Sequence, residues 1–299
     1  MHMNLTLNST NQFTTQTKGL LMALVGSILM SFDPIFIKAS GVEGVDAAFL
    51  FGLFSSISMF TLLHVTSKKG VVKELTSNSQ PVWLSSVLIL ISASSMVISL
   101  KYTSVINVFV IFCASPIITA IFSKYILGES INRTTAVVIV FVLLGVTIVV
   151  SGSINSINLI GDLIALLSVT ALSFNQTFLR KHKNISRIAT IGAGGFLMTI
   201  VLFWFVTPSE YEASTWIIIA FMGLLSAPIG RVLSQVATRY ITATEVGVIL
   251  MLEAAFAPLL AYLFFNELPS YQSIVGGVII FIAILYFVSQ STKQPKLEA

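Results

Sequence analysis

Residues 31–38 read SFDPIFIK, and residues 173–180, which lie 142 positions later, read SFNQTFLR. The serine and both phenylalanines coincide, the aspartate is matched by asparagine, and the final lysine is matched by arginine. A shared pattern of this length predicts that the chain contains two related halves. Each half is then expected to fold on the same plan.

The same relationship continues further along both halves. Tyr102 and Tyr240 each follow a basic residue, and each stands 27 positions before a glutamate, Glu129 or Glu267. We therefore place a first repeat at 19–152 and a second at 159–290. A polar N-terminal tail at 1–18, expected to be disordered, and a short tail at 291–299 complete the chain.

The composition assigns these repeats to a membrane. Hydrophobic residues make up 56% of the chain and charged residues only 9%, too few to keep a soluble surface hydrated. About 20 apolar residues cross the hydrocarbon core as a helix. Ten such runs are present, at 19–39, 46–65, 82–100, 104–127, 134–152, 159–180, 188–207, 214–237, 245–265 and 271–290. The predicted fold class is an all-α integral membrane protein.

The basic residues indicate how the spans are oriented. With a cytoplasmic N-terminus, thirteen fall on the cytoplasmic side, namely Lys18, Lys68, Lys69, Lys73, Lys124, Arg133, Arg180, Lys181, Lys183, Arg187, Arg239, Lys293 and Lys296. Only Lys38 and Lys101 fall outside. Lysine and arginine are retained on the cytoplasmic side, so both termini are predicted to be cytoplasmic, in the inner membrane of the cell. The short, dispersed basic clusters argue against a nucleic-acid partner.

Five spans per repeat is an odd number, so the second repeat enters the membrane from the opposite side. Inverted-topology repeats of this kind are found in many secondary transporters, where the two halves exchange conformations around a midplane site. The alternative is a gene duplication without mechanistic meaning.

Two stretches carry a family resemblance: LKYTSVINVFVIFCASPIITAIFSKYILGES at 100–130 and TRYITATEVGVILMLEAAFAPLLAYLFFNEL at 238–268. They resemble the EamA-type domain of the drug/metabolite transporter superfamily. The second stretch departs from the pattern at Ala254, where a proline is expected, and at Asn266, where a glycine is expected. The resemblance implies a transporter that moves amino acids, purines, vitamins, sugars, drugs or other metabolites, and frequently moves them outward.

Ionisable groups inside spans usually face a cavity or a partner. Asp33, Arg231 and Glu253 are the three here, and one hairpin is expected to bring Arg231 and Glu253 together. Two interpretations stay open: a structural ion pair, or a functional role as a charged substrate anchor or, at Glu253, as a proton-coupling carboxylate. The remaining candidates for a central cavity are Asn107, Asn175, Gln176 and Gln235.

Prolines and helix-end tyrosines are the candidate hinges and gates. Proline leaves a helical carbonyl without its partner and bends the span. The candidates are Pro34, Pro116, Pro228 and Pro258, and Pro228 marks span 8 as the helix most expected to be broken or mobile. Tyr102 and Tyr240 are candidate gates, with anchoring at the membrane interface as the alternative.

The predicted function is secondary transport of small polar metabolites by alternating access. A mixed cavity favours amino-acid-like zwitterions, with export as the direction and protons as a candidate coupling ion. Nucleobases, vitamins and drug-like substrates are alternatives. A membrane-embedded enzyme or a non-transporting membrane partner belongs to another class, and no clustered catalytic motif favours it. No cofactor or metal is expected, and the protein is expected to be a monomer or homodimer.

Overall fold

The computed structural model describes residues 2–42, 44–102, 108, 111–151, 159–266 and 271–293. The first repeat contains α1 (His2–Met30), α2 (Asp33–Ala39), α3 (Val45–Thr66), α4 (Val71–Thr76), α5 (Ser79–Tyr102), α7 (Ser115–Leu127) and α8 (Arg133–Ser151). The second contains α9 (Leu159–Lys181), α10 (Arg187–Leu202), η1 (Phe203–Phe205), η2 (Pro208–Glu210), α11 (Ala213–Phe221), η3 (Met222–Ser226), α12 (Ala227–Ala237), α13 (Ala243–Leu250), α14 (Leu252–Phe265) and α15 (Tyr271–Lys293).

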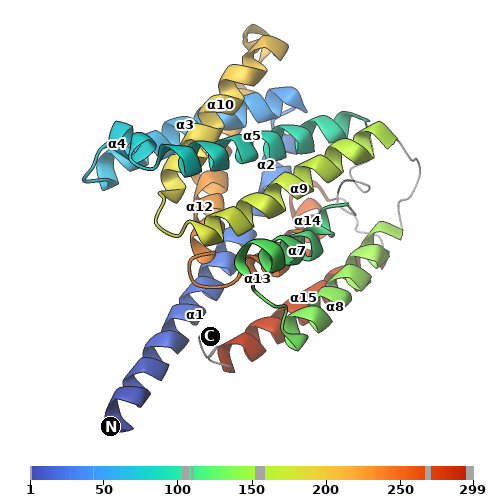
Figure 1. Ribbon diagram of the computed structural model, residues 1–299. Coiled ribbons are helices and arrows are strands. Elements are labelled where there is room, and N and C mark those ends of the chain that lie inside the picture. Colours follow the sequence, from blue (N-terminus) through green and yellow to red (C-terminus); the bar gives the residue numbers. More distant parts are fainter. Residues whose placement is uncertain are drawn as a thin grey trace.

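Six helical stretches are long and apolar enough to cross a membrane by themselves, and shorter apolar helices account for other predicted spans. Several of the predicted spans are built from two consecutive helices, so the ten predicted runs correspond to more than ten elements. The N-terminal segment differs from expectation. The disordered tail predicted at 1–18 is helical from His2 onward, as a continuation of span 1 that projects from the bundle (Figure 1).

Helix pairing follows the repeat. The second spans, α3 and α10, pack against each other, and so do the fifth spans, α8 and α15. α1 packs on α12 in the second repeat, just as its counterpart α9 packs on α5 in the first. α1 rises from the lower left of Figure 1, whereas α9 descends from the upper right, so equivalent helices run in opposite directions. The chain is a pair of five-helix repeats with inverted topology.

Glycine pairs allow the counterpart helices to approach closely. A Cβ added to Gly195 of α10 would lie 2.8 Å from the carbonyl oxygen of Gly52 in α3. A Cβ on Gly52 would lie 2.9 Å from the carbonyl of Gly195, so each glycine occupies the space that a side chain on the other would need. Likewise, a Cβ added to Gly145 of α8 would lie 2.9 Å from the carbonyl oxygen of Gly276 in α15. Small residues at such crossings are typical of helix packing in lipid.

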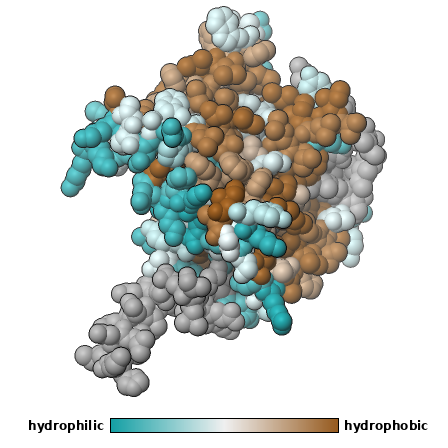
Figure 2. Space-filling view, viewed as in Figure 1, coloured by the Kyte–Doolittle hydropathy of each residue, from teal (hydrophilic) through white to brown (hydrophobic). Residues whose placement is uncertain are grey.

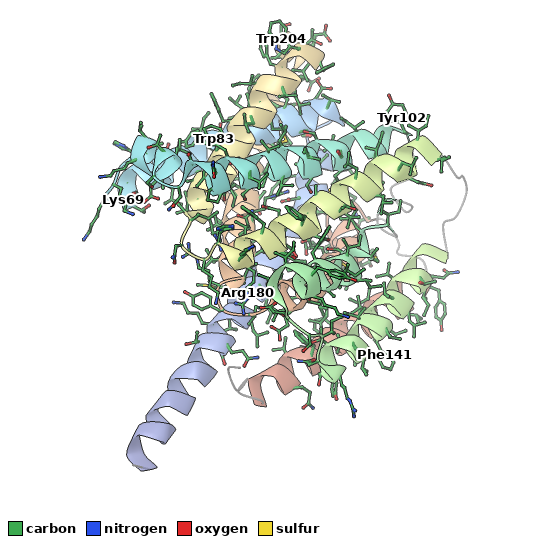
Figure 3. The ribbon with its side chains drawn as sticks, viewed as in Figure 1. Lys69, Trp83, Tyr102, Phe141, Arg180 and Trp204 are labelled. Carbon is green, nitrogen blue, oxygen red and sulfur yellow. The ribbon has the colours of Figure 1, made fainter. Side chains whose placement is uncertain are left out.

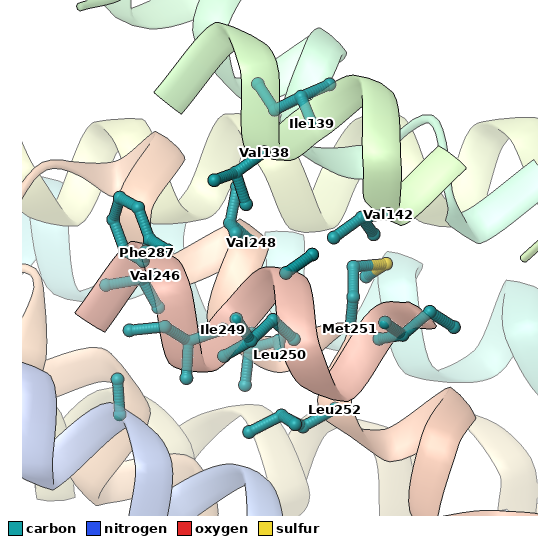
Figure 4. Close-up of a cluster of buried hydrophobic side chains, with 14 of the residues drawn as sticks. Val138, Ile139, Val142, Val246, Val248, Ile249, Leu250, Met251, Leu252 and Phe287 are labelled. Carbon is teal, nitrogen blue, oxygen red and sulfur yellow. The ribbon is translucent and has the colours of Figure 1, made fainter. Parts of the chain in front are cut away.

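The outer surface and the core are both apolar. Figure 2 shows hydrophobic surface over most of this face, with hydrophilic groups gathered at the left and in the lower middle of the view. Exposed side chains of the kind that contact lipid include Val140, Phe141, Ile217, Leu263 and Leu285. Inside, a buried cluster joins α8, α13 and α15, with Val138 and Val142 near Val246, Val248 and Phe287 (Figure 4). The polar side chains inside the bundle therefore stand out against an apolar background.

Candidate substrate site where spans 1, 8 and 9 meet

Span 1 is interrupted immediately before its acidic residue. α1 ends at Met30, Ser31 and Phe32 form a turn, and α2 begins at Asp33 with proline in its first turn. A proline at this position is tolerated because the first N–H groups of a helix have no intrahelical acceptor. Asp33 consequently lies at the amino end of a short helix, where the helix dipole favours a negative charge.

Span 8 is distorted before Pro228, as predicted. Residues Met222–Ser226 form a π-helical segment between α11 and α12. Pro228 has no N–H to donate to the carbonyl of Leu224, and the hydroxyl of Ser58 in α3 donates to that carbonyl instead. Ser226 donates to the carbonyl of Leu29 in α1 at 3.1 Å. The distortion thus fixes span 8 against spans 1 and 2, one turn before Arg231.

Spans 4 and 9 are broken at equivalent positions. Cys113 and Ala114 form the turn before α7, and Met251, 138 positions after Cys113, separates α13 from α14. Pro116, a candidate hinge, lies in the first turn of α7, but the second copy breaks without a proline there. Glu253 is the second residue of α14, so it lies beside this break.

Arg231 and Asp33 form a direct ion pair. Arg231 Nη1 lies 3.0 Å from Asp33 Oδ2, and the Arg231 guanidinium also stacks over the Phe51 ring of α3 at 4.4 Å. The expected partner of Arg231 was Glu253. Among the described residues Arg231 pairs with Asp33 instead, because the break in span 1 presents that carboxylate to α12. Glu253 lies near enough to interact electrostatically with both charges.

The pair leaves binding capacity unused. Asp33 Oδ1 is buried and accepts no hydrogen bond in the described part of the chain. The Arg231 side chain is 29% exposed, although it lies within a span, and a guanidinium has five N–H donors. The site therefore combines a forked cation suited to a carboxylate with two carboxylates, Asp33 and Glu253, suited to an ammonium group.

The polar residues of span 6 occupy a different interface. Asn175 accepts a hydrogen bond from Ser85 of α5 at 2.7 Å, so it joins spans 3 and 6. This is the repeat counterpart of the contact between spans 1 and 8. Gln176 is buried, and its Oε1 would lie 3.6 Å from a Cβ added to Gly247. These contacts are with spans 3 and 9 rather than with Asp33, and Asn107 lies outside the described residues.

The remaining candidate residues lie apart from the Asp33–Arg231 pair, at other helix interfaces and helix ends. Gln235 accepts from Thr190 Oγ1 at 3.4 Å, in the interface between α12 and α10. Tyr102 is exposed at the end of α5 and Tyr240 packs beside Lys18, positions that suit interfacial anchoring (Figure 3). α14 continues through Pro258, so the interruption of span 9 falls at Met251 instead.

One of the cations predicted to lie on the cytoplasmic side is buried. Arg187 is 2% exposed, and its guanidinium donates to four backbone carbonyls, those of Leu179, His182, Ile185 and Gln235. Burial and the nearby charges of Lys181 and Arg187 lower the pKa of His182, whose ring packs on Phe178. Arg187 thus closes the carboxyl end of α9. In the sequence, Arg187 is marked only by its position directly before the predicted span at 188–207.

These features define a class. Ten apolar segments in two inverted repeats, with broken helices meeting at a charged site inside the bundle, are typical of a multi-pass membrane transporter. The model of the EamA-like transporter family matches residues 17–151 and 159–289. The chain belongs to the EamA-like transporter family, and it is a transporter rather than an enzyme. Among the described residues no group of three or more His, Cys, Asp and Glu is arranged to hold a metal ion.

Relatives and a solved structure agree with this assignment. An S-adenosylmethionine uptake transporter of Rickettsia prowazekii is 25% identical over 93% of this chain and 95% of its own length. An uncharacterized transporter of Clostridium kluyveri is 24% identical over 94% and 96%. The pseudopaline exporter CntI of Pseudomonas aeruginosa is 27% identical over 57% and 61%. One crystal structure superimposes with a TM-score of 0.80 over 92% of this chain and 99% of that chain, at 14% identity, which shows the fold alone.

Proposed function

We propose that this protein is a secondary transporter that exports small polar metabolites across the inner membrane by alternating access, with amino-acid-like zwitterions as the substrate class. The proposal includes a cytoplasmic position for both termini, which the distribution of lysine and arginine supports. The observation that carries the proposal is the Asp33–Arg231 pair beside Glu253, at the breaks of two spans. Isolated charges at this depth are costly and usually serve a substrate or ion pathway.

The chemistry of the three side chains supports a zwitterion. Arg231 binds a carboxylate in bidentate geometry, and Asp33 Oδ1 with Glu253 accepts hydrogen bonds from an ammonium group. Phe51, already in contact with the guanidinium, supplies an apolar surface for a side chain. S-adenosylmethionine, which one relative is named for, itself carries an amino-acid head group. A relative named as an exporter supports the outward direction, and substrate uptake into inverted vesicles tests it.

A ligand screen tests the substrate class. We expect amino acids or S-adenosylmethionine to raise the unfolding temperature of the detergent-solubilised protein, because a ligand that binds only the folded state stabilises it. The shift is expected to disappear in Arg231→Met and to persist in Arg133→Met, which removes an exposed arginine at the start of α8. Stabilisation by nucleobases alone, unaffected by Arg231→Met, would refute the zwitterion assignment.

Glu253 is the proposed proton carrier, because it lies beside both members of the ion pair without being the direct partner of Arg231 in the described part of the chain. We expect Glu253→Gln to abolish transport driven by a proton gradient in inverted vesicles, while exchange of labelled for unlabelled substrate continues. Glu210→Gln, which changes an exposed loop carboxylate, is the matched control. Unchanged proton dependence in Glu253→Gln would remove this role.

A further inference from the structure

An ion pair far from the candidate site joins the two repeats at one end of the bundle. Arg180 Nε, at the end of α9, lies 3.0 Å from Glu129 Oε1, in the connection between α7 and α8. Arg180 Nη1 also donates to the carbonyl of Thr238 at 3.1 Å, next to the end of α12. One guanidinium therefore holds together the ends of spans 4, 6 and 8. In Figure 3, Arg180 lies far from Trp204 at the top of the view and from Tyr102 at the upper right.

The backbone presents Glu129 to this arginine. α7 ends at Gly128, which adopts a left-handed conformation with φ of 68°, and Glu129 N–H then donates to the carbonyl of Ser123. A left-handed residue at this position ends a helix by turning the chain across its axis. The side chains of Arg180 and Glu129 are only 16% and 24% exposed, so the pair is shielded from much of the solvent.

The inverted repeat places a related contact at the opposite face. Lys38 is the sequence counterpart of Arg180, and α14 is the counterpart of α7. α14 ends at Asn266, the only described non-glycine residue with positive φ, which reproduces the turn at Gly128. Lys38 Nζ lies 4.9 Å from the ring centre of Phe265, the last residue of α14. Glu267, the counterpart of Glu129, lies outside the described residues, so Lys38 and Phe265 define this contact.

We propose that these two contacts are the closures of the transport path, one at each face of the membrane. The inner contact is Arg180 with Glu129, and the outer contact is Lys38 with the end of α14. Each contact joins a helix end of one repeat to a helix end of the other, so opening either face must break its contact. The pseudo-two-fold relation of the repeats makes the two closures equivalent. This inference rests on the proposed alternating access. It gives the role of closing the transport path to these two contacts rather than to the candidate gates Tyr102 and Tyr240.

Distances between spin labels test the closures in the full-length protein. In a Cys113→Ala background, cysteines at Tyr125 and Lys183 report the inner face, and cysteines at Ala39 and Tyr271 report the outer face. All four labelled positions are exposed. Glu129→Gln or Arg180→Gln is expected to raise the population of long inner distances about two- to fivefold, the effect of losing a partly exposed ion pair. Lys38→Glu is expected to raise long outer distances only.

A charge exchange separates a closure from a folding defect. The double substitution Glu129→Arg with Arg180→Glu is expected to restore the original inner distances, which a merely misfolded variant would not do. Unchanged distances in every variant, or lengthening at both faces from one substitution, would overturn the inference. The distances are measured without substrate. An absence of transport by the unmodified protein would therefore refute the proposed function separately.

Discussion

Replacing Arg231 with methionine or Asp33 with asparagine is expected to weaken substrate binding about 10- to 100-fold. This is the change in affinity that corresponds to the loss of one charged hydrogen bond. Each single substitution also leaves a mostly buried charge without its counter-ion, so each is expected to lower the free energy of unfolding by about 1–3 kcal/mol. We place this below the value for a fully buried pair because Arg231 is 29% exposed. Substrate counterflow in proteoliposomes and thermal unfolding measure the two effects.

The double substitution Asp33→Asn with Arg231→Met separates the two interpretations of the pair. It removes both charges, so it is expected to recover stability relative to the single substitutions. If the pair only holds spans 1 and 8 in register, transport recovers as well. We expect stability to return without transport, because neither side chain can then bind a charged group. Restored transport in the double variant would make the pair purely structural.

Arg187→Met is expected to lower the free energy of unfolding by about 3–5 kcal/mol, the largest stability change predicted here. Four backbone carbonyls lose a charged donor at a site that water does not reach readily, and unsatisfied buried acceptors carry a large penalty. Arg187→Lys is expected to recover only part of this loss, because an ammonium group lacks the planar fork of a guanidinium.

Unfolding midpoints in detergent, with protein yield from membranes as a second readout, measure this effect. Lys183→Met is the matched control, since Lys183 is a nearby exposed cation. If Arg187→Met, like Lys183→Met, has the same unfolding midpoint as the unmodified protein, other groups must donate hydrogen bonds to the four carbonyls. Arg187 would then be dispensable for the junction of spans 6 and 7.

The amino-acid sequence by itself determined the class, the repeat and the outline of the site. Span length depends on about 20 consecutive residues, so hydropathy alone identifies most spans. The match between SFDPIFIK and SFNQTFLR established the duplication, and the rarity of charge inside spans singled out Asp33, Arg231 and Glu253. Pro228 likewise indicated the distortion of span 8, because its missing N–H removes a hydrogen bond within the same span.

Only the tertiary structure decided which groups meet. Arg231 pairs with Asp33, 198 positions away, and not with Glu253 of the neighbouring span. Span 9 breaks at Met251 without the proline that accompanies the break in span 4. Gly52 and Gly195 are unremarkable in the sequence, yet their contact fixes a crossing between the repeats. Lipid is as apolar as leucine, so hydropathy cannot select helix partners. Close packing and backbone hydrogen bonds select them, and both depend on helix rotations that no local pattern records.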